Sequence, residues 1–180
     1  MSAIESTPAW EIEGLPAGGP DPALREPLML FGQFVGDWEI LECRNLQDDG
    51  SWESGRGAIH WRWILEGRAV QDTWMGYDEE AQRMVPGGTT VRFYDPALDA
   101  WHSVWISPLQ GAVRRFFGRS IGDEIVLESK DSTIGGGPER WIFSEITPTS
   151  FRWRGERLRE KSGTWELTEE MRVRRSPPTQ

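Results

Sequence analysis

The chain of 180 residues contains little cysteine and little histidine. Cys43 is the single cysteine, and His60 and His102 are the two histidines. One cysteine excludes an internal disulfide, and these three residues are too few for a Cys/His zinc site, so we expect no metal. We expect no cofactor either, because Gly135-Gly136-Gly137 precedes a proline and a strand and lacks the helix N-terminus that a phosphate loop needs.

Long apolar runs and an excess of positive charge are also absent. The sequence has no run of about 18 apolar residues and no basic N-terminal segment followed by an apolar one, so it predicts neither a membrane helix nor a secretory signal. The 20 basic and 29 acidic residues give a net charge of −9, which disfavours nucleic acid and anionic membranes as partners. These absences predict a soluble cytoplasmic protein without a nucleic-acid or membrane partner, and they leave a homodimer open.

Tryptophan, in contrast, is abundant. Eleven residues are Trp, and most of them occupy every second or fourth position of short strand-like runs. Side chains of a strand alternate between its two faces, so rings at such spacing share one face. The clearest runs are Trp61-Arg62-Trp63, Trp101 to Trp105 and Phe151-Arg152-Trp153. The pattern predicts a β-barrel with an aromatic interior.

The domain organisation predicted from composition is simple. Residues 1–22 are rich in Pro, Gly, Ala and Glu and predict an extended or disordered arm, in which Trp10 and Ile12 either dock onto the barrel or a second subunit or belong to a loose tail. Residues 23–175 predict one barrel domain that begins with a short amphipathic helix over 26–35, which is expected to lie against one end of the barrel. Residues 176–180 predict a flexible tail.

Ten strand-like segments with short connections follow the helix. Short connections favour an antiparallel meander. About ten such strands close most naturally into an all-β up-and-down barrel that can enclose one small ligand, with a β-sandwich as the alternative fold. The expected strands are Trp38 to Arg44, Gly57 to Leu65, Arg68 to Met75, Thr89 to Tyr94, Trp101 to Ser107, Val113 to Arg119, Glu124 to Ser129, Glu139 to Ile146, Ser150 to Glu156 and Thr164 to Arg174.

Several short motifs resemble those of a known superfamily. Phe34-Val35-Gly36-Asp37-Trp38 resembles the Gly-x-Trp opening of the calycins, which include the lipocalins and fatty-acid-binding proteins. The order of the later motifs over residues 28–175 is similar to that of a largely uncharacterised bacterial family of lipocalin-like domains of unknown function; these motifs are Leu65-Glu66-Gly67-Arg68, Phe93-Tyr94-Asp95-Pro96 with Trp101, and Met171 to Arg175.

The resemblance implies a role for Trp38 and for one arginine of the last strand. Trp38 would plug the barrel floor beneath the helix, and Arg172 or Arg174 would stack on its ring. The resemblance implies no particular activity, because calycins include carriers, haem binders and a few enzymes.

The face that carries the Trp rings also carries acids. On this face the expected ligand-binding residues are Trp61, Trp63, Trp74, Trp105, Trp141 and Trp153, and the acids are Glu42, Asp72, Glu145 and Glu169. A carboxyl group among large apolar side chains has a raised pKa unless an arginine or another donor compensates, and such groups are typical of acid–base catalysis. Alternatively the acids pair with arginines or lie at solvated strand ends, and a one-residue register shift would invert each assignment.

These observations support two main functional hypotheses and one structural alternative. The first is the binding of a small, largely apolar or aromatic molecule in a Trp-lined cavity. The second is a cofactor-independent isomerase, cyclase or lyase in which Asp72, Glu145 or Glu169 moves a proton on such a molecule. The alternative is a structural module whose interior is filled.

Overall fold

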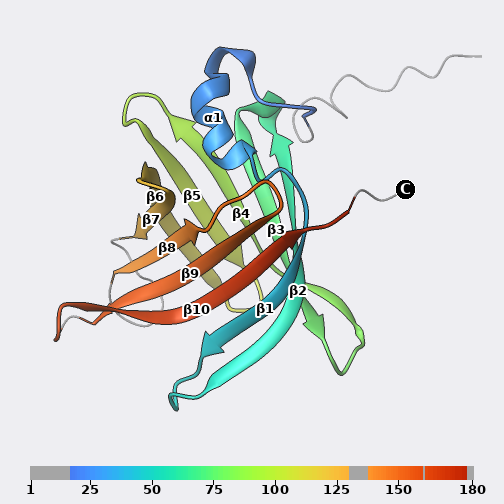
Figure 1. Ribbon diagram of the computed structural model, residues 1–180, viewed down its shortest axis with the longest axis vertical. Helices are drawn as coiled ribbons and strands as arrows, with labels where there is room; N and C mark the ends of the chain where they lie inside the picture. The colour runs from blue at the N-terminus through green and yellow to red at the C-terminus, as the bar shows by residue number, and fades with distance from the viewer. Residues whose placement is uncertain (1–16, 130–137, 160, 178–180) are drawn as a thin grey trace, which may run out of the picture.

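Ten strands run up and down around a common axis, and the first strand pairs with the last (Figure 1). The structure, a computed structural model, describes residues 17–129, 138–159 and 161–177. Trp10 and Ile12 lie outside the described residues. The elements are η1 (Pro22–Leu24), α1 (Arg25–Gly32), β1 (Gly36–Leu46), β2 (Trp52–Ile64), η2 (Leu65–Gly67), β3 (Ala69–Asp78), β4 (Arg83–Asp95), β5 (Ala100–Ser107), β6 (Ala112–Ile121), β7 (Glu124–Ser129), β8 (Glu139–Ser144), β9 (Ser150–Arg159) and β10 (Thr164–Arg175).

The predicted all-β antiparallel barrel is confirmed. Each strand pairs antiparallel with its neighbours in the chain, and the β1–β10 pairing closes the ring, so backbone groups at both edges are hydrogen-bonded. All ten predicted strands are present, although several are longer than expected. The segment Pro86-Gly87-Gly88, whose composition is typical of a turn, lies inside β4 at a bulge opposite Trp74 and Met75.

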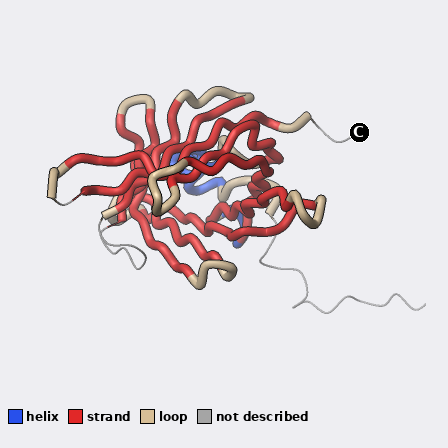
Figure 2. The backbone as a smooth tube through the Cα atoms, turned by 90° about the horizontal axis from the view of Figure 1, so that it is seen from below, coloured by secondary structure: helices blue, strands red, loops and turns tan. Residues whose placement is uncertain are grey.

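The predicted helix covers one end of the barrel but ends earlier than expected. It spans Arg25–Gly32, and Phe34 and Val35 then form a tight turn into β1. Figure 2 shows the strands as a ring seen from below, with the helix at the far end. Leu28 and Phe31 of the helix are fully buried against the barrel interior. Residues 17–22 of the predicted arm lie against the barrel, since the amide of Ala17 donates to the carbonyl of Trp63 at 2.9 Å.

Trp38 lies beneath this helix, as the Gly-x-Trp resemblance implies. Its side chain is 1% exposed, and its Nε1 donates a hydrogen bond to the carbonyl of Phe34 at 2.6 Å. The ring meets Phe151 edge-on, with centroids 4.9 Å apart. Trp38 is therefore a buried contact between the segment after the helix, β1 and β9.

The basic residue that stacks on Trp38 is Arg175, and the expectation of Arg172 or Arg174 is wrong. The guanidinium carbon of Arg175 lies 4.1 Å from the Trp38 ring centre, within cation–π range. Strand alternation explains the correction, because Val173 is buried on the inner face, while Arg172 and Arg174 are exposed on the outer face.

Arg175 also fastens the helical end to the barrel. Its side chain donates to the carbonyls of Gln33 and Val35 after the helix, at 2.8 Å and 2.9 Å, and to the carbonyl of Pro148 at 2.8 Å. Gly36 makes room for this side chain: a Cβ there would lie 2.6 Å from an Arg175 nitrogen, and its φ of +134° suits glycine. The glycine and the tryptophan of the motif thus both serve the arginine contact.

Removing the Trp38 ring should cost much of the stability of the fold. We predict that Trp38→Ala lowers the free energy of unfolding by about 3 to 5 kcal/mol, the range for deleting a buried large aromatic side chain. Urea unfolding followed by circular dichroism measures this. Trp52→Ala, at a ring that is 39% exposed, is the control and should cost about 1 kcal/mol or less. A similarly small loss at Trp38 would contradict its role as the plug of the barrel.

Candidate functional site

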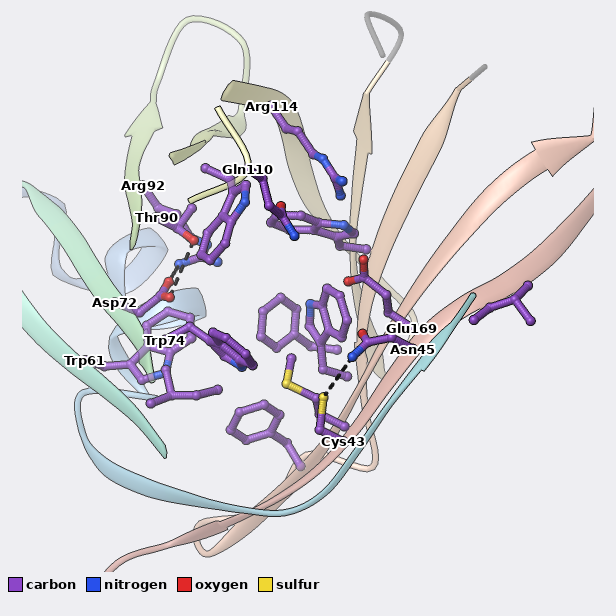
Figure 3. Close-up of a pocket in the computed structure, with 18 of the residues that line it drawn as sticks. Cys43, Asn45, Trp61, Asp72, Trp74, Thr90, Arg92, Gln110, Arg114 and Glu169 are labelled. Atoms are coloured by element: carbon purple, nitrogen blue, oxygen red, sulfur yellow. Dashed lines mark hydrogen bonds and ion pairs between the residues drawn. The ribbon is translucent and has the colours of Figure 1, made fainter. Parts of the chain in front are cut away.

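A cavity of about 450 Å³ occupies the barrel interior below the helix (Figure 3). This volume lies within the range of roughly 300 to 1,000 Å³ that is typical of small-molecule sites. Five of the six predicted ligand-binding tryptophans line it: Trp61, Trp74, Trp105, Trp141 and Trp153. Trp63 is buried too, but its ring packs on Gly32 of the helix and does not line the cavity.

Ring contacts and close backbone approaches hold the aromatic walls in place. Trp141 meets Trp105 and Trp153 edge-on, with centroids 6.1 Å and 5.5 Å apart. Trp74 and Trp105 lie across Gly87 and Gly88, where an added Cβ would come within 2.4 Å and 2.3 Å of the rings. Because Gly87 and Gly88 have no side chains, the two cavity rings can occupy this space.

Asp72 faces the cavity, as expected, and forms a buried ion pair. Its carboxylate binds the Arg92 guanidinium, and both side chains are almost fully buried, with exposures of 6% and 3%. The Thr90 hydroxyl donates to the same carboxylate at 3.4 Å. The Arg92 guanidinium carbon also lies 4.5 Å from the Trp61 ring centre. These contacts hold Asp72 in a buried pair with Arg92.

Two predicted inward acids lie outside the cavity. Glu42 points outward because β1 contains a bulge between Ile40 and Cys43, so that Cys43 takes the inner position. Glu145 follows the last residue of β8 and has a positive φ of 52°, so the strand alternation no longer applies. Its exposed carboxylate forms an outer-surface ion pair with Arg152 at 3.4 Å. The expectation that either acid faces the interior is wrong.

Glu169 lies in the cavity wall on β10, as expected, near Arg114 of β6 (Figure 3). Among the described residues its carboxyl group makes neither a hydrogen bond nor an ion pair. Burial raises the pKa of Glu169; the positive charges of Arg114 and Arg157 offset part of this rise, and the negative charge of Glu139 adds to it. Glu169 is thus a cavity-lining acid with a raised pKa.

A group of charged side chains surrounds Glu169. The carboxylate of Glu139 faces two arginines, with Arg157 Nη2 at 3.1 Å and Arg114 Nη1 at 3.5 Å. The Glu139 side chain is 7% exposed and that of Arg114 is 12% exposed. These groups and Glu169 form the second polar region of the interior, and we call them the Arg114 cluster.

Sequence reasoning did not identify Arg92 and Arg114 as cavity residues. Arginine on a strand usually faces solvent, and Val91 and Phe93 next to Arg92 suggest that the apolar face of that strand points inward. The structure has the opposite arrangement, with Thr90 and Arg92 buried and Phe93 43% exposed. The inward acid Asp72 was the available signal, because a buried carboxylate requires a partner on a neighbouring strand.

Cys43 lines the cavity as a neutral thiol. Burial raises its pKa to about 11; the charge of Glu169 adds to the rise, and a hydrogen bond from Asn45 opposes it. A thiol with this pKa is a weak nucleophile at neutral pH. Within the described part of the chain, no group of His, Cys, Asp and Glu is arranged to hold a metal ion, and no helix is long and apolar enough to cross a membrane.

Comparison with known proteins relates the chain to others through its fold. No family model matches the sequence, and no curated protein matches it. Among solved structures, the S-type phycobiliprotein lyase CPES from Guillardia theta is similar. Its TM-score is 0.54 at 13% sequence identity, and the match covers 84% of this chain and 93% of that chain. At this identity the likeness shows a shared barrel fold.

The raised pKa of Glu169 predicts a pH-dependent stability. Between the ordinary value of 4.5 and the raised pKa, the folded protein holds more protons than the unfolded chain, so stability falls as pH rises through this interval. Glu169→Gln removes this loss. We predict that the variant gains unfolding free energy relative to the wild type as pH rises above the ordinary value of 4.5.

Glu170, on the same strand, provides a control because its pKa is shifted in the opposite direction. Burial acts to raise its pKa, but hydrogen bonds from Arg44 and Arg152 and their charges outweigh burial and lower it. Its stabilisation is therefore present above the ordinary pKa and is lost as pH falls. Glu170→Gln should lose stability mostly near neutral pH. Urea unfolding across the pH series measures both variants, and parallel profiles would contradict the assignment of Glu169.

Proposed function

We propose that the protein binds a small, largely apolar or aromatic molecule in the Trp-lined cavity. One observation carries the proposal: five tryptophans surround about 450 Å³ of space at the centre of a closed barrel. Rigid aromatic walls give a planar ligand a large apolar contact at little cost in side-chain entropy.

The arrangement of the walls supports a ligand site over a filled structural barrel. Phe31 packs against Trp101 and Phe34, and all three side chains are almost fully buried. They fill the helical end of the interior. Trp74 and Trp105 are only partly buried and face the open volume. The interior thus combines a dense core at one end with accessible rings below it. Membership of the uncharacterised bacterial lipocalin-like family remains a prediction.

Binding can be tested with a neutral aromatic dye. We predict that N-phenyl-naphthylamine quenches the tryptophan emission saturably and that Trp74→Ala and Trp105→Ala each weaken its binding by roughly tenfold, or about 1.4 kcal/mol. Trp52→Ala is the matched control, since it removes one tryptophan outside the cavity and should leave the affinity unchanged. An unchanged emission of the wild-type protein with a panel of apolar aromatic dyes would refute the binding function.

The environment of Glu169 favours a second candidate, proton transfer without a cofactor. Of the three acids predicted as catalytic, Asp72 is paired with Arg92 and Glu145 lies on the outer surface. Glu169 has a raised pKa and contacts the cavity, as an acid or base acting on a bound molecule requires. The similar barrel of known structure is a phycobiliprotein lyase, which is compatible with a lyase among the isomerase, cyclase and lyase alternatives.

A probe that needs only one proton removed tests this candidate. Nitrobenzisoxazole is a small aromatic molecule whose ring opens when a base removes its single reactive C–H proton. We predict that the protein accelerates this reaction and that Glu169→Gln lowers the rate by about 100-fold or more. Glu145→Gln, outside the cavity, should leave the rate unchanged. Equal rates for Glu169→Gln and the wild type would exclude Glu169 as the base.

A further inference from the structure

The two polar regions of the cavity differ in their balance of charge. The Asp72–Arg92 ion pair contains one charge of each sign. Glu169 of the Arg114 cluster lies across the cavity from Asp72, as the labelled side chains in Figure 3 show. There, Arg114 and Arg157 share the single carboxylate of Glu139. One positive charge in that cluster is balanced only when Glu169 is ionised.

Burial favours the neutral form of Glu169. Its carboxyl group makes no hydrogen bond and no ion pair among the described residues, and its pKa is raised chiefly by burial. With Glu169 neutral, the Arg114 cluster carries one uncompensated positive charge beside an apolar cavity. Such a charge is unfavourable in these surroundings, and a negative group on the ligand would relieve it.

The other charged and titratable groups near Glu169 leave this balance unchanged. Those on β1 and β2 that line the cavity are Cys43, a neutral thiol, and Glu53, which is exposed and accepts a hydrogen bond from Gln47 at 3.1 Å. On β10 itself, Glu166 binds Arg159, and Glu170 binds Arg44 and Arg152. Glu166 and Glu170 thus have arginine partners, and the charge of the exposed Glu53 is screened by solvent, so Glu169 and the bound molecule remain to compensate the charge of Arg114.

We propose that the ligand carries one carboxylate or similar anionic group, which lies between the Arg114 guanidinium and the Glu169 carboxyl while the apolar body contacts the Trp rings. This inference rests on the proposed binding function. In that position the anion accepts hydrogen bonds from the guanidinium and from the protonated acid. Binding then takes up a proton wherever Glu169 is ionised in the free protein, so affinity falls as pH rises.

A matched pair of probes tests the charge requirement. Anthracene carboxylate and anthracene carboxamide share one ring system and differ in charge, and both can be followed by quenching of tryptophan emission. We expect the carboxylate to bind the wild type roughly tenfold or more tightly than the amide, as hydrogen bonds to charged groups predict. Arg114→Gln should remove this preference, whereas Arg119→Gln, at an exposed residue of the same strand, should keep it.

The outcomes separate this inference from the binding function. Equal binding of both probes by the wild type would overturn the anionic requirement and leave the binding function intact. A preference that persists in folded Arg114→Gln would overturn the assignment of the anchor. If neither probe binds and N-phenyl-naphthylamine also fails, the binding function itself is wrong. The comparison of the two probes on the wild type does not depend on any variant folding.

Calorimetry tests the proton uptake at Glu169. Titrations of anthracene carboxylate in two buffers of different ionisation enthalpy give the number of protons taken up. We expect uptake to approach one proton per ligand at high pH in the wild type and to vanish in Glu169→Gln, whose amide keeps the anion preference but does not titrate. Glu128→Gln, at an exposed glutamate of β7, should behave as the wild type does. Anion binding without proton uptake at any pH would overturn the role of Glu169.

Discussion

The contact between Arg175 and Trp38 is the constraint on which the rest of the structure depends. Arg175 of the last strand stacks on the buried Trp38 ring of the first strand. It also donates hydrogen bonds to backbone carbonyls of the segment after the helix and of the β8–β9 connection, so it joins these parts of the chain. The helix is thereby held across one end of the barrel, where Phe31 and Phe34 fill the space beneath it. A barrel closed at one end in this way keeps a cavity in its remaining length.

Charge inside that cavity is arranged in two different ways. Asp72 and Arg92 form an ion pair that is almost fully buried. This pair joins β3 to β4, and Arg92 packs on the Trp61 ring. Glu169 instead faces the cavity with no direct partner among the described residues, beside arginines already engaged by Glu139. A carboxyl group is thus paired with an arginine on one wall and, among the described residues, has no direct partner on the other.

Strand alternation was sufficient to predict the barrel, because the inner face of a closed barrel imposes period two on the sequence. It also predicted that Asp72, Glu169 and five of the tryptophans face the interior. It failed where the backbone leaves that period. A bulge in β1 places the side chain of Glu42 on the outer face, and a positive φ after β8 directs the side chain of Glu145 outward. Arg92 and Arg114 were missed because a buried arginine is recognised only through its carboxylate partner on another strand. The register between two strands, which decides such a pairing, is not visible in one sequence.

The most direct test of an open, Trp-walled ligand cavity is a crystal structure of the protein with N-phenyl-naphthylamine bound. We predict electron density for the ring system inside the barrel, in contact with Trp74, Trp105 and Trp153, with the helix still packed at the Trp38–Arg175 stack. Tryptophan side chains that fill the interior completely, or a dye bound only to the outer face of the barrel, would contradict this prediction.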